Sequence, residues 1–150
     1  KFKILCTECL TEWGLYSPAV VELMCMIVAH ESMQGRYRRQ VGGPALSLFQ
    51  IEPPTHDDIW QNGPGMKARA NRFGIVKNVV SLETDDRYAI FVARHHLMRD
   101  PNPVPTTPEA MAKYCKSYWN TESGKATAEK YLNDWEQWAN CCYTINRYIR

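Results

Sequence analysis

Proline and glycine residues divide this sequence into blocks of helical length. Pro18 and Pro108 each follow a hydroxyl residue, Ser17 and Thr107 respectively. This pairing is typical of a helix N-terminus, with the hydroxyl as N-cap and proline in the first turn. The strict alternation of apolar and polar residues that marks a half-buried strand is scarce. The pattern therefore predicts a mainly α protein.

The same capping signal recurs along the chain. The residues expected to cap helices are Ser17, Thr55, Thr84, Thr107 and Thr127. Acidic pairs follow Thr55 and Thr84 closely, and negative charge in a first helical turn is favoured by the helix dipole. Residues 46–51 are short, apolar and ambiguous between a strand and a helical turn. We expect an irregular or β segment there, between helices.

The length of 150 residues corresponds to one domain, and we take residues 1–150 as that domain. The chain lacks an initiator Met, which suggests a fragment of a larger chain. Hydrophobic residues make up 45% and charged residues 23%, which excludes disordered and fibrous classes. The longest nearly apolar run, residues 19–29, is interrupted by Glu22 and is shorter than the roughly 20 residues a membrane span needs. We expect a soluble domain without a membrane span.

Charge and cysteine usage narrow the possible partners. Lys and Arg number 18 against 16 Asp and Glu, a balance too mild to indicate nucleic acid as partner. Cys6 and Cys9 could form half a zinc site, but no second CxxC or HxxxH pattern follows. We favour reduced thiols that pack as small apolar residues, with zinc and redox chemistry as the alternatives. The prediction is no metal and no cofactor.

Glu31 is the strongest candidate for a chemical role. It follows Met24 and Ile27 by seven and four positions, so it continues the stripe that faces the core. Partial burial raises the pKa of a carboxyl group, and the C-terminal end of a helix disfavours negative charge. Both effects favour a proton held near neutral pH, as a general acid requires. The alternative is a helix-end glutamate that simply reaches water.

The context of Glu31 carries a resemblance. Glu31-Ser32 is followed by Leu46-Ser47-Leu48-Phe49-Gln50-Ile51, with Gln50 standing 19 positions after Glu31. This resembles the soluble lytic transglycosylase and goose-type lysozyme superfamily, in which a helix ends in Glu-Ser and a Gly-Leu-Phe/Met-Gln-Ile/Val segment follows. The two motifs cover residues 24–53. Residues 52–58 and 93–96 add a looser likeness to the glycan-cleaving domains of tailed bacteriophage virions.

Two positions depart from the family pattern. Ser47 stands where the family usually has glycine, which would permit a positive φ or a close approach to a sugar. Family members also often carry a Tyr-Asn pair whose Tyr hydrogen-bonds the catalytic Glu, whereas Trp119 precedes Asn120 here. Either Tyr118 substitutes from the neighbouring position or that hydrogen bond is absent.

The resemblance implies a lysozyme-like fold and cleavage of the β-1,4 bond between N-acetylmuramic acid and N-acetylglucosamine in bacterial peptidoglycan. Glu31 would protonate the leaving oxygen and then accept a proton from the muramyl C6 hydroxyl, which closes a 1,6-anhydro ring. A hydrolase that inverts needs a second carboxylate. Glu52 is the nearest candidate, since residues 33–46 contain no Asp or Glu. The residues expected to bind substrate are Ser32, Ser47, Gln50, Tyr118 and Asn120.

The remaining expectations concern partners and alternatives. Arg36, Arg38 and Arg39 could meet carboxylates of the muramyl or stem-peptide groups, or form a solvated loop. The expected partners are peptidoglycan glycan strands and other virion proteins. The resemblance implies a virion-associated protein or one released to the cell wall or periplasm. The first residues lack the long apolar stretch of a signal peptide. The competing classes are a structural wall-binding module with a weakened site and a nucleic-acid binder that uses the arginine loop.

Overall fold

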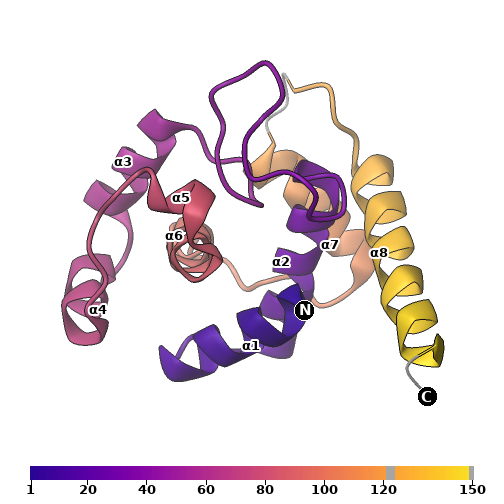
Figure 1. The fold of residues 1–150 in the computed structure, drawn as a ribbon, viewed down its shortest axis with the longest axis horizontal. Helices are drawn as coiled ribbons and strands as arrows, with labels where there is room; N and C mark the ends of the chain where they lie inside the picture. Colours follow the sequence, from indigo (N-terminus) through magenta and orange to yellow (C-terminus); the bar gives the residue numbers. More distant parts are fainter. Residues whose placement is uncertain (121–123, 149–150) are drawn as a thin grey trace.

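The computed structural model describes residues 1–120 and 124–148. Helices make up most of this part of the chain, which confirms the mainly α prediction. α2 lies at the centre of the molecule and packs against α1, α7 and α8, while α3 and α4 lie at the far side of α6 (Figure 1). The elements are α1 (Phe2–Glu12), α2 (Pro18–Glu31), α3 (Pro53–Asn62), α4 (Met66–Phe73), α5 (Ser81–Thr84), α6 (Asp86–Leu97), α7 (Pro108–Tyr114), the π-helix η1 (Cys115–Trp119) and α8 (Ala128–Tyr148).

The central helix begins as the sequence predicts. The hydroxyl of Ser17 accepts a hydrogen bond from the backbone N–H of Val20 at 3.1 Å, and Pro18 occupies the first turn. Every residue of the run 20–29 except Glu22 is buried. A helix that is apolar on nearly all sides must be enclosed by other elements. α2 therefore runs from the core to the edge of the packed helices, where its last residue, Glu31, lies.

The other predicted helix starts are partly right. Thr107 and Thr127 cap α7 and α8 through their hydroxyls. α6 begins one position later than expected, because Asp85 rather than Thr84 accepts a hydrogen bond from the first turn. The prediction for Thr55 is wrong, since α3 already begins at Pro53. Two consecutive prolines have φ preset near the helical value and need no N–H in the first turn, so they start this helix rather than stop a preceding segment.

The segment between α2 and α3 is irregular, as expected. It contains two isolated antiparallel bridges, Arg39 with Leu46 and Leu46 with Ile51. The turn between the bridge partners Leu46 and Ile51 has positive φ at two non-glycine residues, 75° at Ser47 and 53° at Gln50. Ser47 thus adopts the backbone conformation that a glycine would adopt without strain. This turn places Gln50 beside the end of α2.

Ser47 offers a matched pair of stability tests. Its hydroxyl accepts a hydrogen bond from the N–H of Phe49 at 3.1 Å, and its side chain is buried. Ser47→Ala keeps the left-handed strain and loses that acceptor, so we expect about 1–2 kcal/mol of destabilisation. Ser47→Gly loses the same acceptor but relieves the strain, so its net change should be under about 1 kcal/mol. Urea unfolding of both variants measures the difference, and an equal loss in the two would contradict the strain argument.

η1 extends α7 with a wider turn. The backbone N–H of Asn120 donates to the carbonyl of Cys115 at 2.8 Å, five residues earlier. π-turns of this kind are rare and frequently occur at functional sites. Because the wider turn shifts the register of the side chains that follow, it turns Trp119 and Asn120 away from the direction that a continued α-helix would give them.

The cysteines that the structure describes belong to the core. Cys6, Cys9, Cys25 and Cys115 are buried, and burial raises the pKa of the Cys6 thiol to about 12. Burial also raises the pKa of the Cys9 and Cys115 thiols, so these three groups stay protonated at neutral pH. All four cysteines pack in the core as small apolar residues. Residues 141 and 142 lie outside the described side chains. Across the described helices, none has both the length and the apolar character required to cross a bilayer.

Candidate active site

A cleft of about 540 Å³ opens at the C-terminal end of α2. Its walls come from the loop after α2, the start of α3, the end of α6 and η1. It combines apolar and aromatic side chains with carboxylate and amide groups in one concave surface, as ligand-binding pockets do. The residues that line it are Glu31, Met33, Tyr37, Arg39, Gln40, Val41, Ala45, Gln50, Ile51, Glu52, Thr55, His96, Trp119 and Asn120.

Glu31 stands in this cleft as a partly buried carboxyl group with one strong partner. The hydroxyl of Tyr131, on α8, donates a hydrogen bond to Glu31 Oε1 at 2.6 Å. Burial raises the pKa of Glu31, while the Tyr131 hydrogen bond and the nearby His30 oppose that rise. Burial and the Glu31 charge raise the pKa of Tyr131, so it remains a hydroxyl donor. Glu31 is thus a carboxyl group able to hold a proton above the usual pH range of a glutamate.

A second layer of contacts fixes Tyr131. The ring of His30 packs on the ring of Tyr131 with centroids 4.0 Å apart. His30 Nδ1 lies 2.7 Å from Asp134 Oδ2, and the side-chain amide of Gln34 donates to the Asp134 carbonyl at 2.8 Å. The end of α2 and one face of α8 are therefore joined around the phenol that contacts Glu31. The sequence analysis assigns a role to neither His30 nor Tyr131.

The structure brings together four of the residues predicted from the sequence. Glu31, Gln50, Glu52 and Asn120 all line the cleft. The side-chain amide of Gln50 donates to the carbonyl of Ser47 at 2.9 Å, which sets the orientation of that amide. Glu52 is exposed at the start of α3. These positions come from three separate segments of the chain, and only the fold joins Asn120 to the others.

Three other predicted residues lie outside the cleft lining. Ser32 and Ser47 are fully buried; the Ser32 hydroxyl donates to the carbonyl of Val28 at 2.7 Å, and Ser47 supports its own turn. The hydroxyl of Tyr118 donates to the carbonyl of His96. Both alternatives considered for Tyr118 are therefore wrong: the hydrogen bond to Glu31 exists, and it comes from Tyr131. Trp119 lines the cleft and donates its indole N–H to the carbonyl of Phe49 at 3.3 Å.

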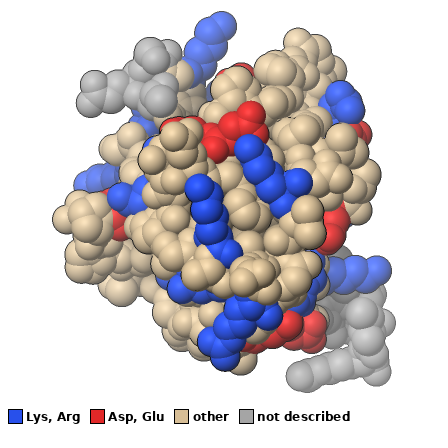
Figure 2. Space-filling model, turned by 90° about the vertical axis from the view of Figure 1, so that its left-hand side faces the viewer, with Lys and Arg blue, Asp and Glu red and all other residues tan. Residues whose placement is uncertain are grey.

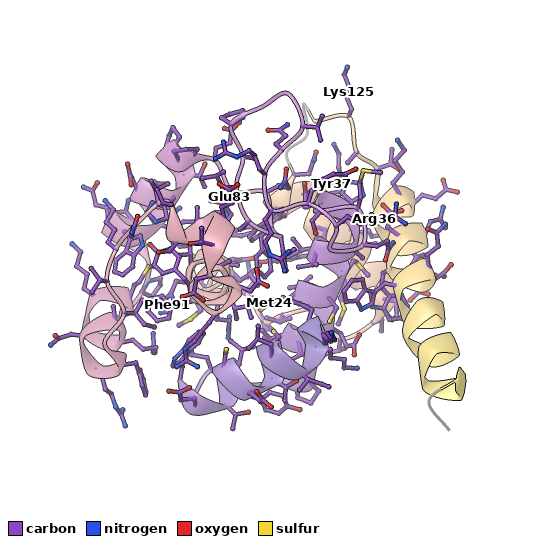
Figure 3. The ribbon with its side chains drawn as sticks, in the orientation of Figure 1. Met24, Arg36, Tyr37, Glu83, Phe91 and Lys125 are labelled. Carbon is purple, nitrogen blue, oxygen red and sulfur yellow. The ribbon has the colours of Figure 1, made fainter. Side chains whose placement is uncertain are left out.

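The arginine loop is anchored by ion pairs. Arg38 makes two hydrogen bonds to Asp86, at 2.8 and 2.7 Å, and Arg39 makes two to Glu83, at 3.1 and 2.7 Å. In Figure 3, Glu83 and the loop residue Tyr37 lie on the same side of the core, above Met24. The guanidinium groups of Arg38 and Arg39 tie the cleft wall to α5 and α6, and the loop that carries them is exposed to solvent, as one of the two alternatives expected. Such paired, planar contacts fix geometry as well as charge.

The surface over α3 and α4 bears on the nucleic-acid alternative. Figure 2 shows Lys and Arg side chains on this face together with acidic ones. Lys77 contacts Asp57 at 3.3 Å and Arg99 contacts Asp58 at 2.7 Å. On this face, the described residues mix the two signs of charge rather than forming the dense basic surface that phosphate binders use.

Comparisons with known proteins do not help to assign a function to this cleft. No family model, curated protein or solved structure matches this chain. A function for the site must therefore be argued from Glu31, its hydrogen-bond donor and the residues that line the cleft around it.

Proposed function

We propose that this protein cleaves the β-1,4 bond between N-acetylmuramic acid and N-acetylglucosamine in bacterial peptidoglycan, with Glu31 as the catalytic acid and then the base. The observation that carries the proposal is a partly buried carboxyl group, held by Tyr131, in a cleft that also presents Gln50 and Asn120. The motif resemblance of residues 24–53 supports the substrate class. An amide pair can both donate to and accept from the acetamido groups of such a glycan.

The contacts of Glu31 suit both halves of the reaction. Protonated Glu31 gives its proton to the glycosidic oxygen, and Tyr131 occupies Oε1, which leaves Oε2 for that transfer. The resulting carboxylate is stabilised by the Tyr131 hydrogen bond and by the nearby His30. It then accepts the proton of the muramyl C6 hydroxyl while that oxygen bonds to C1. That proton regenerates the acid form of Glu31, and no water is consumed in the bond exchange.

Hydrolysis is the second candidate, and the position of Glu52 favours it. Glu52 is exposed to solvent in the same cleft as Glu31. A carboxylate placed so can activate a water molecule on the far side of the sugar, as inverting enzymes require. Under the transglycosylase proposal, Glu52→Gln should keep the rate of glycan cleavage within a few-fold of wild type, while a hydrolase that inverts should lose about 100-fold or more.

Product analysis tests the proposed function directly. Purified peptidoglycan is digested with the wild-type protein, and the soluble fragments are identified by mass spectrometry. The proposal expects anhydro-muramyl ends. Reducing muramyl ends would assign the hydrolase instead. Absence of any soluble product, with a folded protein that still co-sediments with the wall, would assign a wall-binding module and overturn catalysis.

The role of Tyr131 gives a prediction in the pH profile. Its hydrogen bond lowers the pKa of Glu31, so Tyr131→Phe should raise that pKa further. A general acid must be protonated, so its ionisation sets the alkaline limb of kcat/KM. We expect that limb to move to higher pH and kcat to fall by about 10-fold, because the carboxylate loses a stabilising donor. An unmoved limb would mean that Tyr131 only fills space.

The place of action follows from the substrate. A peptidoglycan-cleaving protein works at the bacterial cell wall, reached either from a virion or by release into the periplasm. The likeness to phage virion domains supports the first route and makes other virion proteins the proposed partners. Mass spectrometry of purified virions tests that route, which requires this chain to be detected in them.

A further inference from the structure

His96 forms part of the cleft wall. It lies near the end of α6, and its ring packs against those of Trp119 and Tyr118, with centroids 5.0 and 5.4 Å away. Tyr118 also donates a hydrogen bond to the backbone carbonyl of His96. The imidazole is therefore held in place from η1 on one side and reaches the cleft on the other.

The two ring nitrogens of His96 differ. Nδ1 is buried and has no hydrogen-bond partner among the described residues. Since His96 lines the cleft and Nδ1 is the buried nitrogen of its ring, we take Nε2 as the nitrogen that the cleft can reach. A buried N–H without an acceptor is rarer and more costly than a buried lone pair. The stable neutral tautomer of His96 thus carries its hydrogen on Nε2, toward the cleft.

The surroundings keep this ring uncharged. Burial lowers the pKa of His96 to about 4, and Arg99 adds to that effect against the opposing influence of Asp58. Among the described residues that line the cleft, Arg39 is the one Lys or Arg side chain, and it is paired with Glu83. These residues therefore offer no unpaired positive charge to an anionic ligand. To a neutral oxygen acceptor they offer an N–H donor beside an aromatic ring.

We propose that His96 is a specificity-determining residue, whose Nε2–H donates a hydrogen bond to the carbonyl oxygen of an N-acetyl group on the bound saccharide. The ring of Trp119, which packs on His96, supplies apolar surface for the acetamido methyl group. This inference rests on the proposed function and names the substrate feature that the cleft reads. It selects N-acetylated sugars over sugars that carry a hydroxyl at the same carbon.

The test uses saccharide binding, so that it does not depend on catalysis. The probes are tri-N-acetylchitotriose and cellotriose, which differ by an acetamido or hydroxyl group at C2. Binding to the Glu31→Gln protein is measured by calorimetry. We expect tri-N-acetylchitotriose to bind at least about 10-fold tighter than cellotriose, the ratio that one hydrogen bond to a neutral group can supply.

Variants of His96 separate recognition from packing. His96→Phe keeps an aromatic ring against Trp119 and Tyr118 but removes the donor, and we expect the preference for the acetylated sugar to disappear. His96→Gln keeps an N–H donor and should restore part of it. Thermal unfolding of each variant shows whether the fold persists. If His96→Phe folds and keeps the full preference, the inference is overturned.

Nitrogen NMR of the histidine rings supplies a readout that a purely structural role would not move. Free protein should show the Nε2–H tautomer at His96, and tri-N-acetylchitotriose should shift that nitrogen while leaving His56 and His95, which do not line the cleft, unchanged. An Nδ1–H tautomer, or failure of the sugar to bind at millimolar concentration, would overturn the inference. Peptidoglycan digestion is scored separately: no cleavage with intact His96-dependent binding would reject the proposed function and leave this inference standing.

Discussion

Glu31→Gln is expected to reduce peptidoglycan cleavage by at least about 1,000-fold, within the range that a general acid contributes to a rate. Glutamine has the same shape, and its carbonyl oxygen can still accept the hydrogen bond that Tyr131 now gives to Oε1. The variant has no proton to transfer to a leaving oxygen and cannot accept one afterwards. The measurement is the rate at which soluble muropeptides appear, followed by chromatography. Glu136→Gln, at an exposed position of α8, is the matched control and should cleave at the wild-type rate.

The same substitution should not destabilise the fold. The folded pKa of Glu31 lies above its unfolded value, so the carboxyl group is neutral in both states below the unfolded pKa, and its ionisation opposes folding as pH rises through the folded pKa. Glu31→Gln should therefore melt at an equal or higher temperature than wild type at pH 7, and the gap should close toward pH 4. Activity comparable to wild type in a stable variant would remove Glu31 from the mechanism.

Acid is expected to destabilise this protein by several kcal/mol between about pH 6.5 and pH 4, before most carboxylates titrate. Burial lowers the pKa of three histidines, and for His95 and His96 it lies at about 4. In this window the unfolded chain binds more protons at these positions than the folded chain does. Stability is therefore complete above the unfolded pKa of about 6.5 and is lost as pH falls through the folded pKa values.

Two of these histidines have contacts that require a neutral ring. Tyr88 Oη accepts from the Trp60 indole at 2.9 Å and from the Asn78 backbone at 3.0 Å, so its own hydrogen must go to His56 Nε2, 2.6 Å away. His95 Nε2 lies 2.8 Å from the Arg69 guanidinium, which can only donate. Protonation would place a donor against a donor in both cases.

Urea unfolding at pH 7.0, 5.5 and 4.5 checks this expectation. Glu31 contributes in the opposite direction in the same window, so the Glu31→Gln protein gives the cleaner curve. The unfolding free energy should fall at each step toward acid. A midpoint that stays constant from pH 7.0 to 4.5 would show that the buried rings are protonated at no cost, against the environment described for them.

Local signals in the sequence predict much of the fold, and their limits are physical. Caps such as Ser17 and Thr107 act on the next few residues, so the sequence places the starts of α2 and α7. The end of α2, and with it Glu31, follows from periodicity. The predicted start of α3 at Thr55 is wrong because the two prolines before it have a fixed φ that suits a first helical turn, and the helix already begins with them. The pattern at Cys115–Trp119 contains no sign of a π-turn, since that widening comes from packing.

The candidate site, too, is predicted only in part from local signals in the sequence. Gln50 is predicted by its motif spacing, and its approach to the cleft depends on a left-handed turn that Ser47 would not suggest. Tyr131 has no local signal, because its partner Glu31 lies 100 positions earlier and only the packing of α2 on α8 joins them. A tyrosine in a helix rich in aromatic residues is more often core, and here it is both buried and hydrogen-bonded to the acid.

That separation has a consequence for shortened versions of the protein. A product that stopped before the last helix would still carry the complete Glu-Ser and Leu-Phe-Gln motif and would look intact to a motif search. It would nonetheless lack Tyr131, whose hydroxyl donates to Glu31, and the surface of α8 that packs against α2. Possession of the motif and possession of a working acid are therefore separate properties, decided at opposite ends of the chain.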